Sequence, residues 1–506
     1  MTFNRQICSA IALLIASLTA QAQQPVDPLR TAVEQALNTS PEVTARFNAY
    51  RAAVDSVDAA RGGFYPRLDA NANIGRDTDR ITNRDPVTLP LNRAEAGLTL
   101  SQLLWDGMGT KNDVDRAGHD RLARYFELLD TTEQTALEAA RAHFDVQRFR
   151  RLVQLAEDNY VQHRFAYLQI QSRFKAGVGR GVDLEQAGAR VALAESNLTT
   201  EVANLHDVTV RYQRVIGIAP PKELPVITMM KDGIPAAPGD AMAVAVSRSP
   251  AISATIEGLR SARSSVEGRK STFQPRIDAR LRGTFGNNVD AIQDRKRDTA
   301  AEIVMSWNLF NGGADQARVR QQTNLLNQAT DLRDKACRDT RQTTAIAFND
   351  TKKLIDQLVY LDQNTLAIQK ARDAYHQQFD IGQRSLLDLL NAENELYTAR
   401  RAYANAEYDL GFAYVRTQAA MSQLVPALGV ARSENVATDA SGWSQGDDSP
   451  MRCPTLVAET FNVDRTELDA RAKKLAESVP TPVPAPMLAP SAPAPSMKAT
   501  PPVRKP

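Results

Sequence analysis

Two parts of this chain, about 200 residues apart, carry the same short motifs in the same order. The peptide FYPRLDA at 64–70 matches FQPRIDA at 273–279, and LWDG at 104–107 matches LFNG at 309–312. A period of roughly 200 residues is much longer than any solenoid unit. The pattern therefore predicts two copies of a whole supersecondary assembly, in which each motif is half of a pseudo-symmetric pair.

Each copy predicts the same succession of elements. A helical segment (28–61 or 240–270) comes first, followed by two strand-like segments around a polar hairpin. A long stretch without proline (107–174 or 312–379) then predicts helix, and it would extend about 100 Å if continuous. No compact domain accommodates such rods, so they indicate a coiled-coil tunnel or a stalk.

The strand-like segments alternate apolar and polar residues with a period of two. This alternation is typical of a half-buried sheet, or of a barrel wall with lipid on one side and water on the other. The first hairpin is four residues longer than the second, and we expect the difference to lie in an exposed loop. The apolar positions in chain order are Leu68, Ala70, Ala72, Ile74, Ala96, Leu98, Leu100, Ile277, Ala279, Leu281, Phe285, Ile303, Met305, Trp307 and Leu309.

A seven-residue repeat follows each long stretch, after Gly177 and after Gly382. In the first copy it reads Leu184, Val191, Leu198, Leu205 and Tyr212, and in the second Leu389, Leu396, Tyr403 and Leu410. Alanine recurs three residues later, at Ala187, Ala194, Ala392, Ala399, Ala406, Ala413 and Ala420. A strict heptad makes helices supercoil along a common seam, and alanine lets their backbones approach closely.

The N-terminus predicts export. Arg5 precedes an apolar stretch and an Ala20-Gln21-Ala22 site, so residues 1–22 are interpreted as a signal peptide cleaved after Ala22. Gln23 follows the cleavage site, where a lipoprotein would need cysteine. After the signal peptide no stretch approaches the 18 consecutive apolar residues of a transmembrane helix. The net charge of +2 gives no indication of a basic surface for nucleic acid. Whether the two mature cysteines, Cys337 and Cys453, pair is left open.

We expect five parts: the signal peptide, a first repeat (23–219), a Pro/Gly-rich linker (220–239), a second repeat (240–428) and a C-terminal extension (429–506). The extension has a modest helical patch near 466–478 and a Pro/Ala-rich end that predicts disorder.

No enzyme is predicted. The five histidines are scattered, and none has a second ligand at helical spacing, so we expect no metal and no cofactor. Gly177–Gly181 (GVGRG) follows a helix rather than a strand, which favours a turn over a nucleotide site. No catalytic motif is present.

Polar residues after the two helix breaks are the remaining candidates. Arg384, Asp388 and Asn391 have spacings that place them on one helical face, and Asp183 is the matching acid of the first copy. The alternative is a plain helix cap, with the acid in a first turn where the helix dipole favours it.

Over residues 28–428 the order, spacing and duplication of these elements resemble the TolC-type outer-membrane channel proteins. The resemblance implies an α+β fold: a long antiparallel α-helical coiled-coil barrel in the periplasm, joined to a transmembrane β-barrel. It also implies a homotrimer in which each protomer gives four strands to a barrel of twelve in outer-membrane lipid. The implied partners are a periplasmic adaptor (membrane fusion) protein and an inner-membrane ABC or proton-driven transporter.

The same resemblance assigns roles at the periplasmic tip. Asp388 occupies an acidic-ring position, and Arg384 and Asp183 occupy positions that bond across the constriction. Phe379 stands where the best-known member has tyrosine, and Asn391 where it has a second aspartate. The implied adaptor-docking turns contain Gly177, Val178, Gly382 and Gln383.

The function expected is a passive exit duct in the outer membrane, gated at its periplasmic tip. The sequence leaves two cargo classes open: polypeptides of type I secretion and small molecules of drug efflux. The non-lipidated N-terminus and the long C-terminal extension slightly favour secretion. The rival interpretation is a soluble periplasmic coiled-coil scaffold without a pore, which would have no use for the four strands.

Overall fold

The computed structural model describes residues 27–80, 82–83, 85, 87–223, 229–289, 293–430, 448, 450–457 and 463–478. The chain divides into two units, 1–457 and 458–506. The predicted signal peptide (1–22) and the Pro/Ala-rich end (479–506) lie outside the described residues.

Within the first unit the same order of elements occurs twice. The first series is α2 (Pro28–Thr39), α3 (Pro41–Arg61), the 3₁₀ turn η1 (Gly62–Phe64), β1 (Arg67–Arg80), β2 (Thr88–Trp105), α4 (Gly109–Lys175) and α5 (Gly181–Ile216). The second is α6 (Pro238–Arg248), α7 (Pro250–Lys270), η2 (Ser271–Phe273), β3 (Arg276–Asn287), β4 (Arg295–Ser306), α8 (Ala314–Asp380) and α9 (Leu386–Ala420), followed by the short α10 (Leu424–Ala427).

A Ser-Pro pair divides each predicted helical segment into two helices. Ser40 ends α2 and caps α3, its Oγ accepting the N–H of Val43, and Ser249 does the same for α7 with Ile252. Proline follows each serine at the first helical position, where its missing N–H is not needed. The predicted helical segments 28–61 and 240–270 are therefore helical, each as two helices with a break at the Ser-Pro pair.

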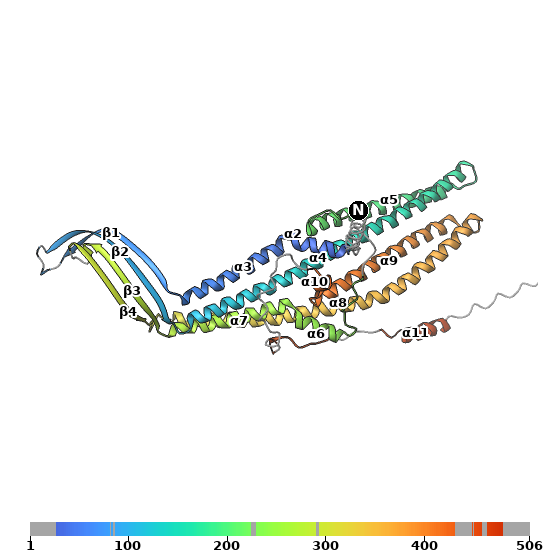
Figure 1. Ribbon diagram of the computed structural model, residues 1–506. Coiled ribbons are helices and arrows are strands. Elements are labelled where there is room, and N and C mark those ends of the chain that lie inside the picture. Colours follow the sequence, from blue (N-terminus) through green and yellow to red (C-terminus); the bar gives the residue numbers. More distant parts are fainter. Residues whose placement is uncertain are drawn as a thin grey trace, which may run out of the picture. The chain divides into compact units, whose positions relative to one another are not determined.

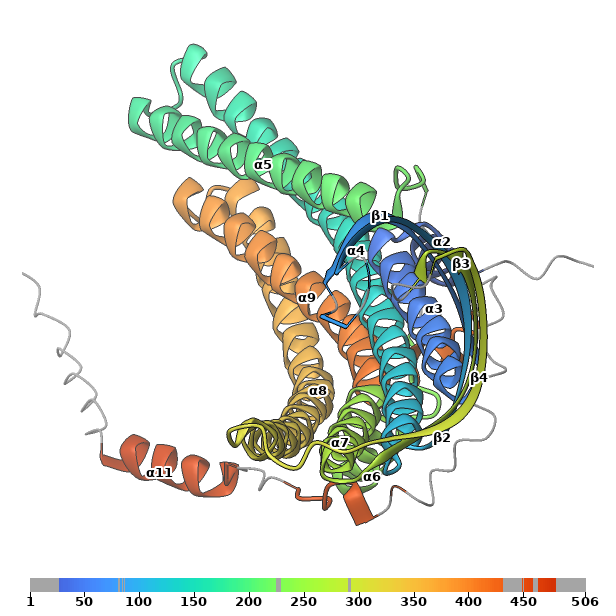
Figure 2. The ribbon, with the colours of Figure 1, turned by 90° about the vertical axis from the view of Figure 1, so that its left-hand side faces the viewer.

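The long rods are continuous helices. α4 and α8 have 67 residues each, about 100 Å at the usual rise. The part of α4 nearer the sheet packs on α3 and α7, and its far part pairs with α5; α8 packs in the same way on α7 and α9. The strands therefore lie at one end of the unit and the two helical hairpin turns at the other (Figure 1). Viewed from the sheet end, the α4–α5 and α8–α9 pairs are two separate arms (Figure 2).

The four strands form one antiparallel sheet in the order β1-β2-β3-β4. The connections 81–87 and 288–294 are equal in length, whereas β1 has 14 residues and β3 has 12, each paired throughout with its hairpin partner. The extra length of the first hairpin thus lies in the strands and not in the loop, contrary to prediction. A longer paired ladder keeps the added backbone groups hydrogen-bonded.

One face of this sheet exposes large apolar side chains. Ile74 is 87% exposed and Ile303 is 74% exposed, although isoleucine is among the residues most often buried. Leu68, Leu98, Leu281, Phe285 and Met305 are exposed on the same sheet. None of the helices in the described part of the chain is long and apolar enough to cross a membrane.

Alanines line the seams of the helix pairs, as the heptads predicted. Ala187 and Ala194 of α5 and Ala392, Ala399, Ala406 and Ala413 of α9 are buried, whereas Ala420 is only partly buried. The largest apolar core lies where α2, α4, α5 and α9 meet, around Leu37, Phe144 and Ile216. The arms beyond it have thinner cores.

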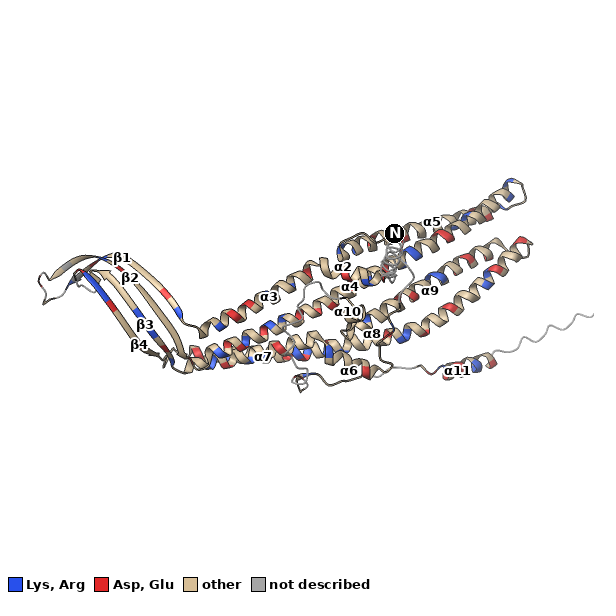
Figure 3. Ribbon diagram, in the orientation of Figure 1, with Lys and Arg blue, Asp and Glu red and all other residues tan. Residues whose placement is uncertain are grey.

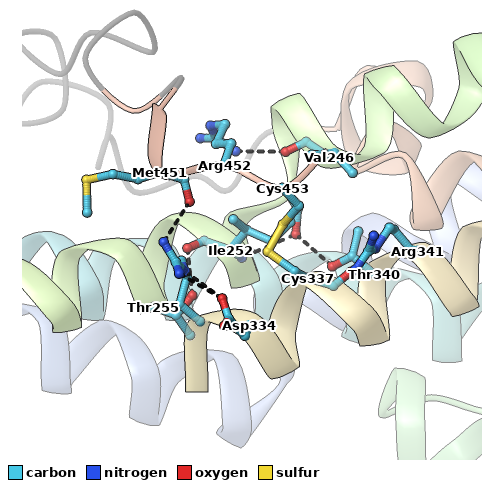
Figure 4. The surroundings of a disulfide bond; sticks show 12 residues. Val246, Ile252, Thr255, Asp334, Cys337, Thr340, Arg341, Met451, Arg452 and Cys453 are labelled. Atoms are coloured by element: carbon cyan, nitrogen blue, oxygen red, sulfur yellow. Dashed lines mark hydrogen bonds and ion pairs between the residues drawn. A yellow bond between two sulfur atoms is a disulfide. The ribbon is translucent and has the colours of Figure 1, made fainter. Parts of the chain in front are cut away.

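Part of the C-terminal extension is fastened to the second series. Cys453 forms a disulfide with Cys337 of α8, with the two Cα atoms 5.8 Å apart, so the open pairing is resolved. Arg452 donates to the carbonyl of Val246 at 2.9 Å and to Ser253 Oγ at 2.8 Å (Figure 4 shows the first of these bonds beside the disulfide). The fully buried carboxylate of Asp448 accepts from Arg260 at 2.6 Å.

The described part of the second unit is one helix, α11 (Arg465–Ser478), close to the predicted patch. Asp464 caps it, with its Oδ1 accepting from the N–H of Thr466 at 2.9 Å. No residue of this helix is buried.

Candidate gate at the helical tip

Each arm ends in a tight turn that needs glycine. Gly177 (φ 77°) follows α4 and Gly382 (φ 76°) follows α8, both in the left-handed region that side chains disfavour. The N–H groups of Val178 and Gly179 bond the carbonyl of Arg173, while those of Gln383 and Arg384 bond the carbonyl of Gln378. These bonds satisfy carbonyls that the helix ends leave free. Val178 is 79% exposed, so the first turn offers an apolar side chain to solvent.

The second turn is ordered by side chains around Asp388. Ser385 caps α9, its Oγ accepting the N–H of Asp388 at 3.3 Å and donating to Asp388 Oδ2 at 2.9 Å. Arg384 lies 3.7 Å from the same carboxylate oxygen, and its Nε donates to Gln378 at 3.1 Å. The Arg384 guanidinium also lies over the ring of Tyr375, 4.8 Å from the centroid. Arg384 and Asp388 thus form a charged cluster within the second arm.

The arms meet through a small apolar cluster just behind the turns. It joins Ala166 and Ile170 of α4 and Ala187 of α5 to residues of the second arm, which are Phe379, Leu386, Leu389 and Leu390. Phe379 fills this contact with its ring, and the guanidinium of Arg173 from the first arm lies over that ring at 5.1 Å. An arginine stacked on an aromatic ring is attracted by the ring's negative face.

Polar contacts between the arms continue along α9. Arg190 of α5 donates from Nη2 to Asn391 Oδ1 at 2.7 Å. Farther from the tip, Arg401 of α9 pairs with the buried Glu201 of α5 at 2.6 Å. Farther still, Asp409 of α9 accepts from Arg148 of α4 at 2.9 Å. Of these three contacts, the one with Asn391 lies nearest the turns.

The predicted site residues therefore fall into three groups. Phe379 and Asn391 contact the other arm, whereas Arg384 and Asp388 contact each other and their own arm. The carboxylate of Asp183 makes no hydrogen bond or ion pair with another described residue, although it lies in the first turn of α5. The prediction that Arg384, Asp388 and Asn391 share one helical face was wrong for Arg384, because α9 begins only at Leu386.

Two residues that sequence reasoning missed, Arg190 and His163, lie at this junction. Burial lowers the pKa of His163 to about 4, and the nearby charge of Arg190 acts in the same direction. Nothing in the local sequence identifies either residue, because their neighbours come from other helices. Among the described residues, no group of three or more histidine, cysteine, aspartate or glutamate side chains could hold a metal ion.

Acid should destabilise the junction through His163. A histidine whose pKa is lowered by folding contributes stability that is complete above its unfolded pKa near 6.5 and is lost as pH falls toward 4. Between pH 8 and pH 5 this loss is about 2 kcal/mol per chain. We expect His163→Gln to avoid this loss, so its melting temperature should fall less than that of wild type over the same interval.

His143, whose pKa burial also lowers to about 4, acts in the same direction as His163, whereas Glu133, whose pKa burial raises to about 7, gains stability over the same interval and acts in the opposite direction. The matched control is His206→Gln, because His206 is exposed on α5. Thermal melts of the three proteins at both pH values measure the effect. Equal pH dependence in wild type and His163→Gln would contradict it.

A family model, related sequences and solved structures all match this chain over most of its length. The family model of the outer membrane efflux proteins matches residues 32–217 and 242–423. The outer membrane efflux protein BepC of Brucella suis is 26% identical over 410 residues, which are 80% of this chain and 87% of that protein. The outer membrane protein TolC of Escherichia coli is 22% identical over 431 residues, 80% of this chain and 85% of its own. The crystal structure of the CmeC outer membrane channel of Campylobacter jejuni superposes with a TM-score of 0.70 at 16% identity, covering 80% of this chain and 87% of that one.

Proposed function

Because this chain belongs to the outer membrane efflux protein family, we propose that it works as a trimeric exit duct gated where its helical arms meet. The family and its TolC-type relatives place the protein in the outer membrane, with the helices in the periplasm. The finer elements of the proposal are the trimer, the gate, the partners and the cargo.

The exposed apolar face of the sheet carries the proposal. A four-stranded sheet in the order β1-β2-β3-β4 has two unpaired edges, and unpaired backbone groups are not tolerated in lipid. Joining β4 of one copy to β1 of the next removes both edges. Three copies then close a barrel of twelve strands, with the face that carries Ile74 and Ile303 toward lipid. A soluble scaffold would leave this apolar face in water, so that alternative is disfavoured.

The gate is proposed at the two turns and the contacts behind them. In a trimer, three copies of Asp388 around the axis concentrate negative potential, which favours bound cations. Opening moves the arms apart, so it breaks the Arg190–Asn391 bond and the Arg173–Phe379 contact. Asn391 is uncharged, so its three copies in a trimer would not form a second acidic ring; each instead accepts a hydrogen bond from Arg190 of the other arm.

The exposed turns are the proposed docking points for a periplasmic adaptor. Gly177 and Gly382 present backbone to solvent, Val178 presents an apolar side chain, and Gln383 presents a polar amide. An adaptor that binds separated arms more tightly than joined arms would shift the gate toward the open state. An inner-membrane transporter supplies the energy, and cargo passes through the duct without chemical change.

Conductance in planar lipid bilayers tests the proposal. The purified full-length protein is expected to form channels, and Asp388→Asn should raise the concentration of divalent cation needed for half-block by roughly tenfold. Asparagine keeps an acceptor for Ser385, so the cap survives the change. Arg384→Ser should raise resting conductance more modestly, because Arg384 acts within one arm. A wild-type protein that neither inserts nor conducts would refute the duct.

The cargo class is tested by the strain that lacks the protein. Loss of a secreted polypeptide from the culture medium indicates type I secretion. Increased sensitivity to several small toxic compounds indicates efflux. A complementing Asp388→Asn variant should restore either phenotype, since the charge affects block and not the path itself.

A further inference from the structure

Arginines continue the apolar face of the sheet at its end remote from the helices. Residues directly opposite each other in an antiparallel ladder project to the same face. On β1 the exposed apolar series ends at Ile74 and is followed on the same face by Arg76 and Arg80. On β4 the series Met305, Ile303, Ala301 is followed by Arg297 and Arg295. Figure 3 shows basic residues in the part of β4 remote from the helices.

The boundary between apolar and basic residues slopes across the sheet. Arg297 lies in the same row as Phe285, Ala96 and Ala72, two residues before Ile74 on β1. Strands of a closed barrel tilt by about 35–45° from the axis, so a row of paired residues does not stay at one height in the membrane. On tilted strands, a boundary between apolar and basic residues that is parallel to the membrane therefore crosses the paired rows of the sheet at an angle. On the two central strands the matching positions are Asn92 and Asn287, so the arginines belong to the two edge strands.

These four arginines are exposed and form no ion pair with another described residue. The acids of the same strand segments project to the opposite face, where Asp77 pairs with Arg93 at 3.3 Å. Asp298 on β4 also lies on that opposite face. These acids thus lie on the face opposite the four arginines, a face that also carries Arg93: Arg76 beside Asp77 and Arg297 beside Asp298 point in opposite directions.

The other rim of the apolar face is aromatic instead. Tyr65, Trp307 and Phe310 are exposed near the junction of strands and helices, together with Phe64, Trp105 and Phe273. Aromatic side chains are typical of a membrane interface, where their rings sit at the level of the headgroups. The two rims therefore differ in chemistry, which indicates that they meet different headgroups.

We propose that Arg76, Arg80, Arg295 and Arg297 bind the phosphate groups of the phosphorylated glycolipid in the outer leaflet of the outer membrane. Guanidinium groups bind phosphate through paired, charge-assisted hydrogen bonds. The inference rests on the proposed trimer, because joining β4 to β1 of the next copy brings two arginines of each chain to the same seam. Each of the three seams then offers four arginines to an anionic headgroup that carries more than one phosphate.

Binding of lipid A tests this inference. The full-length protein is placed in phosphatidylcholine nanodiscs with increasing amounts of fluorescent bisphosphorylated lipid A, and binding is followed by energy transfer from labelled protein. Replacing all four arginines by glutamine should weaken binding by roughly tenfold or more, because each basic residue near a membrane surface adds to attraction. The matched control is Arg280→Gln with Arg282→Gln, which removes two arginines from the opposite face.

Three further measurements decide the outcome. Dephosphorylated lipid A should bind wild type and the fourfold variant equally, and millimolar inorganic phosphate should not displace lipid A from wild type. Displacement by inorganic phosphate, or equal lipid A binding by wild type and the fourfold variant, would overturn the inference. If the fourfold variant conducts like wild type in bilayers, the proposed duct function is supported whatever the lipid result. If wild type itself does not conduct, the proposed duct function is refuted.

Discussion

Arg190→Ala is expected to raise the resting conductance of the reconstituted protein by about tenfold or more. The Arg190–Asn391 bond joins the two arms at 2.7 Å and lies nearest the turns among the polar contacts between α9 and the first arm. A hydrogen bond to a charged group contributes about 1.5–3 kcal/mol, and a symmetric trimer has three such bonds. Each 1.4 kcal/mol changes an equilibrium tenfold, so losing all three bonds shifts the gate strongly toward open.

The effect of Arg190→Ala on conductance should depend on Asn391, the residue to which Arg190 donates its hydrogen bond. Asn391→Leu removes the same bond, so the double variant Arg190→Ala with Asn391→Leu should conduct little more than either single variant. Arg180→Ala is the matched control, because Arg180 is exposed at the same turn and makes no ion pair with another described residue. Single-channel recordings in planar bilayers measure all four proteins. If the two single changes raise conductance additively, Arg190 and Asn391 do not act through a shared bond. If Arg180→Ala also raises resting conductance, the effect comes from the loss of positive charge near the turn.

Removal of the disulfide is the second large expected effect. Cys337 and Cys453 are 116 residues apart in sequence, and closing a loop of about 100 residues stabilises a protein by ~5 kcal/mol in the chain-entropy account. Replacing both cysteines by serine should lower the melting temperature by about 5 °C, given the usual unfolding entropy per residue for a unit of this size. Hydrogen exchange of residues 450–457 should also increase, since this segment would then be held only by non-covalent contacts such as the hydrogen bonds of Arg452.

A reductant supplies the control. Wild type treated with dithiothreitol should melt like the serine double variant, while the variant itself should not respond to the reductant. If the double variant keeps both the wild-type melting temperature and the wild-type exchange of 450–457, the disulfide does not anchor the extension.

Much of the fold could be predicted because its signals are local. Alternation of Leu68 to Ile74 predicts a strand, the lack of proline over long stretches predicts rods, and Gly177 and Gly382 mark their ends. The Ser-Pro breaks at Ser40 and Ser249 are equally local signals, because a capping serine followed by proline at the first helical position marks the start of a new helix. The extra length of the first hairpin was assigned to the wrong place, since alternation alone does not say where pairing stops.

The site was predicted less completely. The cluster of Arg384, Ser385 and Asp388 is confined to a few consecutive residues, so the capping alternative was visible in the sequence, and Ser385 does cap α9. The contacts that join the arms were not visible. Arg190 and Asn391 are about 200 residues apart, and neighbours on one helix do not reveal which residue of another helix they will meet.

Signals within the sequence identify the elements of this protein: two series of helix, strand pair, long helix and heptad helix, and two glycine turns. These depend on residue periodicity and backbone preference, which act over a few residues. Long-range packing, by contrast, brings Phe379 and Asn391 to the other arm, pairs Cys337 with Cys453, and gathers arginines at one rim of the sheet. Those facts depend on the register in which helices and strands pack, and packing register is set by contacts between residues far apart in the chain.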